Sequence, residues 1–346
     1  MKFDFCIGNP PYQEEQENTS DDPIYNNFMD NAFGIAEKVE LVTPARFLFN
    51  AGKTPKAWNK KMLNDAHFKV LEYVQDSKKY FSGKEISGGV AITYRDDSSN
   101  FGAIEHFVVN TEIMDIYTKV VKSEGFISLK TEIYLQNKFN LDELYKDYPN
   151  AKNKISSNGN EKRMVSSAFE NLDEVFKDNY DERDIRICGL KDRNRFYKYI
   201  SAKYISKQQT NLDKYKVLLS AADGASGTIG KPVPARIIGN TSIEDINTGY
   251  TQTFISIGAF SKKDDAINLE KYLHTKFARF MVGINKVTNG LKIEVWNDVP
   301  IQNFTNNSDI DWSKSIHEID EQLYKKYKLT DKEIEFIETH IKEMCL

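Results

Sequence analysis

The residues best suited to chemistry lie near the start of the sequence, where Asn9-Pro10-Pro11-Tyr12 directly follows the apolar run 3–7. Two acceptors, the Asn9 side-chain oxygen and the Pro10 carbonyl, are suited to bind both N–H groups of a conjugated amine. Proline fixes the backbone so that this carbonyl is not used within a helix. The lone pair of the amine would then face an incoming methyl group, and methyl transfer from a sulfonium needs in-line approach but no strong base. The Tyr12 ring offers a flat face to a nucleobase rotated out of a duplex. The motif therefore predicts methyl transfer to an amino group, and the alternative is a rigid turn at a strand end.

The elements that must position this motif have the pattern of an α/β layer. Residues 3–7 read as a short buried strand that Gly8 and the prolines end. Alternating helical and strand-like runs follow, which indicates a parallel sheet. We predict helices and strands at 23–37 (helix), 39–43 (strand), 55–66 (helix), 68–74, 86–95 and 103–109 (strands). Asn9 and Tyr12 are then expected in a cleft at the carboxyl-terminal edge of the sheet.

The pattern changes after residue 110. Helical and irregular segments continue to about residue 185, and short strand-like runs alternate with glycine-containing turns beyond it. The predicted elements are strands at 215–220, 234–238 and 252–257, an amphipathic helix at 264–283, and tail helices at 314–327 and 331–344. Thr330 and Glu333 form a capping box for the last helix. These patterns predict three domains, at 1–110, 111–304 and 305–346.

Charge is unevenly distributed along the chain. The net charge is −4, but residues 186–216 hold nine Lys and Arg against two Asp, with tyrosine and phenylalanine between them. Such a stretch suits a phosphate-binding face. The alternative is a solvated helix-and-turn surface.

Composition excludes several other classes of protein. The chain has no apolar run of about 20 residues and no signal peptide, which argues against membrane insertion and secretion. Cys6, Cys188 and Cys345 are scattered and odd in number, which favours a reducing cytoplasm over a disulfide framework. The five histidines show no metal-ligand spacing, so we expect no metal site.

The segment FDFCIGNPPYQ resembles the motif of N6-adenine-specific DNA methyltransferases of restriction–modification systems. Similarity continues in LVTPARFLF (41–49), through 70–95, in a region like the family's target-recognition domain (205–304), and in the helical ending. The resemblance implies S-adenosyl-L-methionine as cofactor and double-stranded DNA as partner. It makes Asn9, Pro10, Pro11 and Tyr12 catalytic and adds Phe81 beside Tyr12 for stacking of the target base, with a core position as the alternative for Phe81.

The sequence departs from this family at the cofactor site. Members of this motif order carry an upstream glycine-rich loop and an acidic residue for the cofactor's ribose, whereas eight residues precede Asn9 here. The segment 222–230 lacks the strand-to-helix setting that such a loop needs. The expected fold is therefore a partial Rossmann-like methyltransferase sheet without its N-terminal cofactor half, followed by a mixed α+β target-recognition domain and a helical tail. A fragment, a subunit of a split enzyme and a degenerate remnant remain alternatives.

These observations favour a component of an adenine-N6 DNA methyltransferase that is inactive alone. We expect a partner chain or segment with the cofactor loop, an apolar edge and face beside residues 3–7 to receive it, and a fused or separate restriction endonuclease. A DNA-binding specificity module without catalysis and a protein-glutamine amide methyltransferase are the alternatives. The residues predicted to bind DNA are Arg186, Lys191, Arg193, Arg195, Lys198, Lys203, Gly224 and Gly227.

Overall fold

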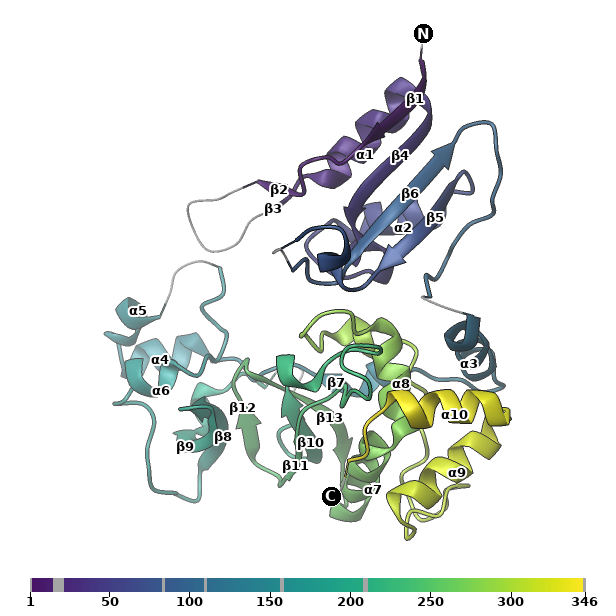
Figure 1. Ribbon diagram of the computed structural model, residues 1–346. Helices are drawn as coiled ribbons and strands as arrows, with labels where there is room; N and C mark the ends of the chain where they lie inside the picture. The colour runs from purple at the N-terminus through teal and green to yellow at the C-terminus, as the bar shows by residue number, and fades with distance from the viewer. Residues whose placement is uncertain are drawn as a thin grey trace. The chain divides into compact units, whose positions relative to one another are not determined.

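The computed structural model describes residues 2–14, 22–82, 85–108, 111–155, 159–207 and 211–344. The chain divides into two units (Figure 1). The first comprises Met1–Asp115 with Ile284–Thr288, and the second comprises Ile116–Gly283 with Asn289–Leu346. The described part of the predicted tail 305–346, residues 305–344, belongs to the second unit.

The first unit contains a four-stranded sheet in the order β1-β4-β6-β5. Its strands are β1 (Phe3–Gly8), β4 (Ala36–Pro44), β5 (Phe68–Val74) and β6 (Val90–Asp96). The four predicted strands thus lie in one sheet, but the expectation of a parallel sheet is wrong. The strands β1, β4 and β5 run in one direction and are joined by helical crossovers, whereas β6 is antiparallel to both of its neighbours, β4 and β5.

Residues 103–108, predicted as part of a further strand, form no strand. The positive φ angles of Gly102 (82°) and Glu105 (54°) interrupt the extended conformation there. The remaining short elements of the unit are β2 (Gln13–Glu14), β3 (Asp22–Pro23), η1 (Ala45–Phe49) and η2 (Ser77–Lys79).

Two helices, α1 (Tyr25–Ile35) and α2 (Lys56–Leu63), pack on one face of this sheet (Figure 1). Met29 and Trp58 from these helices form a core with Val39 and Leu41 of β4. The buried positions of β4 alternate with more exposed ones, as expected for a strand with one covered face.

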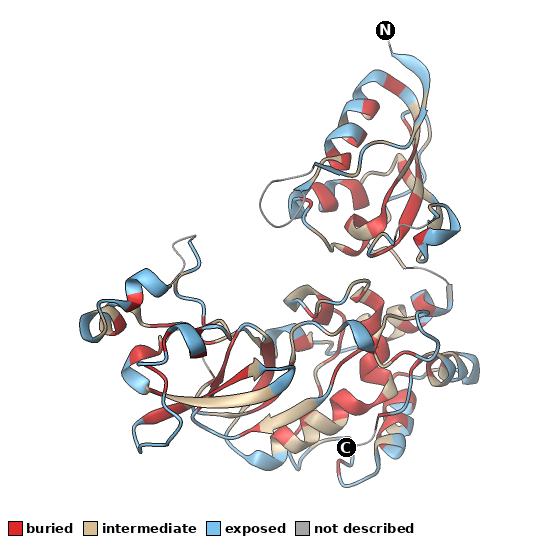
Figure 2. Ribbon diagram, turned by 60° about the vertical axis from the view of Figure 1, so that its left-hand side comes forward, coloured by how far each residue is buried: buried red, intermediate tan, exposed pale blue. Residues whose placement is uncertain are grey.

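The edge strand β1 is not buried, contrary to its prediction as a buried strand, although its exposure agrees with the apolar edge and face expected beside residues 3–7 (Figure 2). Phe3, Phe5 and Ile7 are 69%, 63% and 75% exposed. Because side chains alternate along a strand, these three share one face, whereas Cys6 points to the core on the other. An apolar face at the sheet edge is thus open to solvent.

The second unit contains two further sheets, in the orders β11-β10-β13-β7 and β12-β8-β9. Their strands are β7 (Ile133–Tyr134), β8 (Asp184–Lys191), β9 (Asn194–Ser201), β10 (Tyr215–Ser220), β11 (Thr241–Glu244), β12 (Thr248–Tyr250) and β13 (Phe254–Phe260). Most of the basic stretch is therefore the β8–β9 hairpin and not a helix-and-turn surface. The strand predicted at 234–238 is absent because Ile237 has a φ of 70° and its N–H donates to the Ser226 carbonyl.

The helix predicted at 264–283 is divided into α7 (Lys263–His274) and α8 (Lys276–Asn285). Thr275 is buried and extended, and the Asp320 carboxylate accepts hydrogen bonds from the first two N–H groups of α8, at 2.9 and 2.8 Å. This cap starts a second helix. The other helical elements are α3 (Thr111–Val121), η3 (Leu129–Glu132), α4 (Leu141–Asp147), α5 (Ala151–Lys154), α6 (Ala168–Asn171), η4 (Ala202–Tyr204), η5 (Gly224–Ser226), η6 (Ile293–Trp296), α9 (Ile316–Lys326) and α10 (Asp331–His340). The capping box predicted for the last helix is confirmed.

Candidate functional site

A cleft of about 930 Å³ in the first unit brings together the residues that the sequence singled out. Its described lining consists of Asn9, Pro10, Pro11, Tyr12, Gln13, Pro44, Arg46, Phe81, Glu85, Ile86 and Ser87. The complete predicted motif and the predicted stacking residue therefore line one concavity.

The topology explains why distant segments meet there. The strands β1 and β4 run parallel, so Asn9, which follows β1, and Pro44, the last residue of β4, reach the same sheet edge. The segment Glu85–Ser87 arrives at this edge because it precedes β6, whose Val90 pairs with Pro44. The cleft is thus a consequence of strand order.

Two hydrogen-bond acceptors on the cleft wall are available to a ligand. The Asn9 side chain is exposed, and the Pro10 carbonyl follows it at the end of β1. Within the described residues, neither group takes part in a hydrogen bond. Adjacent acceptors of this kind match the two N–H donors of one amino group.

Aromatic rings form another part of the wall. The rings of Tyr12 and Phe81 meet edge to face, with centroids 6.1 Å apart and an interplanar angle of 84°. The Tyr12 hydroxyl is buried without a hydrogen-bond partner among the described atoms, and burial raises the pKa of Tyr12 to about 12. Tyr12 therefore presents a neutral aromatic surface at physiological pH.

The turns beside the cleft depend on glycine. Gly88 and Gly89 have φ angles of 84° and 76°, and a Cβ at Gly89 would lie 2.4 Å from the Val74 carbonyl oxygen. The Gly89 carbonyl accepts a hydrogen bond from Ala45 N–H at 3.0 Å. This contact fixes the turn before β6 against η1.

Sequence reasoning did not assign a role to Arg46, which also lines the cleft. Its position just after β4 could have identified it, because residues that follow neighbouring parallel strands gather at one sheet edge.

The basic residues of the β8–β9 hairpin are distributed over both of its faces. Cross-strand pairing puts Arg186 and Arg195 on one face, and Lys198 on the other. Arg186 pairs with buried Glu244 at 3.0 Å, and Arg195 donates to the Asn240 carbonyl at 3.1 Å.

Other predicted DNA-binding lysines are also paired inside the protein. Lys198 lies 2.5 Å from Asp178, and Lys203 pairs with Asp147. At the hairpin tip, by contrast, Lys191 and Arg193 are exposed, and neither forms an ion pair within the described part of the chain. The tip is thus the part of the hairpin with free positive charge.

The two predicted glycines of the second unit lie in and after η5. A Cβ at Gly224 would lie 3.1 Å from the Asn289 side chain. Gly227 has a φ of 73°, and a Cβ there would lie 2.7 Å from the Lys231 carbonyl oxygen. The close backbone approach at these glycines is therefore to the protein's own chain.

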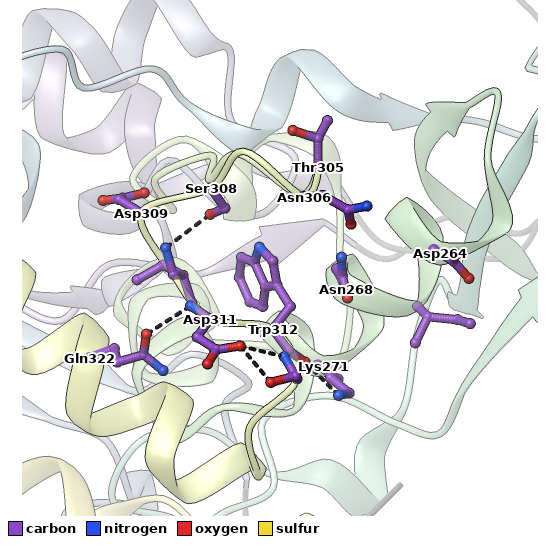
Figure 3. Close-up of a pocket in the computed structure, with 13 residues that line it drawn as sticks. Asp264, Asn268, Lys271, Thr305, Asn306, Ser308, Asp309, Asp311, Trp312 and Gln322 are labelled. Atoms are coloured by element: carbon purple, nitrogen blue, oxygen red, sulfur yellow. Dashed lines mark hydrogen bonds between the residues drawn. The ribbon is translucent and has the colours of Figure 1, made fainter.

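A second cavity, of about 610 Å³, lies in the second unit and has an acidic lining (Figure 3). Asp264, Asp309 and Asp311 line it with a single lysine, Lys271, whose ammonium donates to the Trp312 carbonyl at 2.6 Å. This charge balance is unfavourable for a nucleic-acid phosphate.

Metal-binding groups, free thiols and membrane-spanning helices are the other features that could carry a function. No group of three or more His, Cys, Asp or Glu suited to a metal ion occurs among the described residues. Cys6 and Cys188 are free thiols, whereas Cys345 lies outside the described residues. No helix in the described ranges is long and apolar enough to cross a membrane.

Comparison with known proteins connects the cleft to methylases. The family model for the Eco57I restriction-modification methylase matches residues 1–81, which include Asn9, Tyr12 and Phe81. An uncharacterized adenine-specific methylase of Mycoplasma pneumoniae is 32% identical over 95 residues, or 26% of this chain. The aligned region covers 22% of that protein, so the chain spans about a fifth of its relative. Residues 1–81 are therefore similar in sequence to a family of restriction-modification methylases, and about a quarter of the chain is similar to an adenine-specific methylase.

Proposed function

We propose that this chain supplies the target-base cleft and a DNA-binding unit of an adenine-N6 DNA methyltransferase in a restriction–modification system. The observation that carries the proposal is the pair of available acceptors, on Asn9 and Pro10, in a cleft lined by Tyr12 and Phe81. The sequence similarity of residues 1–81 to methylases supports it independently.

The residues of the cleft suit the exocyclic amine of adenine. The Asn9 side-chain oxygen and the Pro10 carbonyl accept one hydrogen bond each from the amine, which orients its lone pair out of the purine plane. The Tyr12 ring stacks on the purine, a contact worth about 1–3 kcal/mol per base. The amine is thereby held for attack, and the uncharged phenol of Tyr12 adds no competing base.

The cleft does not fit the whole of S-adenosyl-L-methionine, the implied methyl donor. Its described lining contains no glycine and only one carboxylate, Glu85. A nucleoside cofactor in this type of fold requires close backbone approach at a glycine-rich turn. We therefore derive no step through the cofactor and assign to this chain only the binding and orientation of the amine.

The open face beside β1 is the proposed docking surface for the cofactor-binding segment, whether in the same polypeptide or in a partner chain. Phe3, Phe5 and Ile7 present apolar surface there. Apolar surface at an unpaired sheet edge favours addition of another strand. Alone, the chain should bind S-adenosyl-L-methionine more weakly than with a micromolar dissociation constant. One or two hydrogen bonds of about 1 kcal/mol each fall short of the roughly 8 kcal/mol that micromolar binding requires.

Duplex DNA is the proposed partner of the second unit, with Lys191 and Arg193 of the hairpin tip as phosphate contacts. Their side chains are exposed and make no ion pair among the described residues. A restriction endonuclease, fused or separate, would complete the proposed system.

A direct test measures binding of the trinucleotides d(TAT) and d(TGT) to the full chain by NMR titration. We expect d(TAT) to bind about tenfold more tightly, because guanine lacks the amine at the corresponding ring position. Asn9→Ala should abolish this preference, whereas Asn306→Ala, at an exposed asparagine of the second unit, should leave it unchanged.

Equal binding of both trinucleotides would contradict the adenine assignment. A glutamine-containing peptide can be titrated in parallel. Asn9-dependent binding of that peptide, without adenine preference, would assign the cleft to a protein amide instead.

A further inference from the structure

Besides the carboxylate of Glu85, the described lining of the cleft contains one more charged group, the guanidinium of Arg46. Among the described residues that line the cleft, Arg46 is the only cation. Its side chain forms no hydrogen bond or ion pair within the described part of the chain, including with Glu85 in the same lining. A half-buried guanidinium left in this state is positioned to receive an anion.

The surrounding backbone holds the stem of this arginine in place. A Cβ at Gly88 would lie 2.5 Å from Arg46 Cγ, and one at Gly52 would lie 3.4 Å from Arg46 Cβ. Both glycines have positive φ angles, of 84° and 88°. Two glycine turns therefore leave the space that the methylene stem of Arg46 fills.

The backbone around Arg46 is anchored on both sides. Ala45 N–H donates to the Gly89 carbonyl at 3.0 Å, and Ala51 N–H donates to the Arg46 carbonyl at 2.9 Å. Because η1 and its side chain are already ordered, less conformational entropy is lost when the guanidinium binds a ligand.

We propose that Arg46 binds a phosphodiester of the DNA strand whose target nucleotide enters the cleft, and that it thereby positions that nucleotide. This inference rests on the proposed function, because a base rotated into the cleft stays joined to two anionic phosphates. Arginine matches a phosphate with two parallel N–H donors, and such contacts fix position without reading sequence. Arg46 is thus a positioning residue, and Asn9 and Pro10 contact the base.

The test compares two forms of d(TAT) bound to the full chain, one with phosphodiester linkages and one with neutral methylphosphonate linkages. Wild-type protein should prefer the charged form by about tenfold, the value of one charge-assisted hydrogen-bond pair. Arg46→Gln should remove this preference while leaving affinity for the neutral form unchanged. For the charged form, the slope of log affinity against log salt should also be smaller in Arg46→Gln than in wild type by about 0.7, as expected for one lost contact to single-stranded nucleic acid.

Two further variants separate phosphate binding from effects on folding. Arg46→Lys keeps the stem and the charge but loses the planar fork, so an intermediate preference is expected. Arg183→Gln, at an exposed arginine of the second unit, should retain the full preference. Thermal unfolding of each variant establishes that it is folded.

Two outcomes would overturn the inference, and a third would support it while contradicting the adenine assignment. An unchanged charge preference in folded Arg46→Gln would exclude phosphate binding by Arg46, whatever the adenine preference. A loss of S-adenosyl-L-methionine affinity without any change for d(TAT) would assign Arg46 to a carboxylate instead. Loss of the d(TAT) over d(TGT) preference, with the charge preference still dependent on Arg46, would remove the adenine assignment but keep the phosphate site.

Discussion

The cleft of the first unit and the β8–β9 hairpin of the second use polar residues in opposite ways. In the cleft, the side chains of Asn9 and Arg46 make no hydrogen bond or ion pair with the described residues. In the hairpin, Arg186 and Lys198 pair with carboxylates of their own unit. Polar groups without internal partners are available for ligands, whereas paired charges contribute to folding. Partnering, rather than density of charge, therefore distinguishes a candidate site from a structural network.

Removal of the buried carboxylate that the hairpin side chains contact should have the greatest consequence for stability. Glu244 is 2% exposed and accepts hydrogen bonds from Arg186, Tyr197 and Ser242. Glu244→Ala should lower the free energy of unfolding of the second unit by about 3 kcal/mol, because it leaves polar groups without a partner. Urea denaturation measures this change.

The matched control is Glu321→Ala. Glu321 is exposed, and within the described residues its ion-pair partner is His317. Its expected effect is within about 0.5 kcal/mol. Equal effects of the two substitutions would show that the hairpin network does not stabilise the fold.

A second buried carboxylate, that of Asp320, should make the stability of the second unit depend on pH. Burial raises the pKa of Asp320 from 3.8 to about 7, although N–H groups at the start of α8 oppose the shift. Between these values the folded chain binds more protons than the unfolded chain. The stability of the second unit should therefore fall as pH rises from about 4 to about 7, by at most about 1.4 kcal/mol per pH unit.

Asp320→Asn provides the comparison for this prediction. It retains one acceptor oxygen, which can bind one of the N–H groups of Lys276 and Phe277, but it does not titrate. The difference in unfolding free energy between wild type and variant should change over this pH range. A constant difference from pH 4 to pH 7 would contradict the assignment of the pH dependence to Asp320.

In the cleft, substitutions should affect ligand binding and leave stability nearly unchanged. Tyr12→Ala should weaken d(TAT) binding about tenfold, since base stacking contributes about 1–3 kcal/mol. Tyr12→Phe should retain binding, because the ring remains and the buried Tyr12 hydroxyl has no described partner. NMR titration measures affinity, and thermal unfolding measures stability. A loss in Tyr12→Phe equal to that in Tyr12→Ala would assign the effect to the hydroxyl rather than to stacking.

Within the hairpin, exposed and paired cations should differ modestly in their contribution to DNA binding. Arg193→Ala at the exposed tip should reduce the slope of log affinity for duplex DNA against log salt by about 0.9. Lys198→Ala should change this slope less, because Lys198 already pairs with Asp178. Salt-titrated fluorescence anisotropy measures both. A larger change for Lys198→Ala would mean that its internal ion pair opens when DNA binds.

Local sequence determined several features of this protein. The limits of β5 and β10 agree with those predicted, and the Thr330–Glu333 capping box forms as expected. The place of Asn9 after a strand end was also readable, because an apolar run followed by glycine and prolines specifies where the strand stops. Such features depend on residues only a few positions apart.

Tertiary structure decided what depends on distant partners. The break at Thr275 involves Asp320, which caps α8 from far along the chain. The antiparallel direction of β6, the exposure of β1 and the pairing of Arg186 with Glu244 likewise arise between segments that are remote in sequence. Arg46 lines the cleft because β4 pairs with β1 and because Gly88 packs against the methylene stem of the Arg46 side chain. Periodicity and composition describe each segment's own preferences, whereas burial and charge pairing are properties of the segments that pack together.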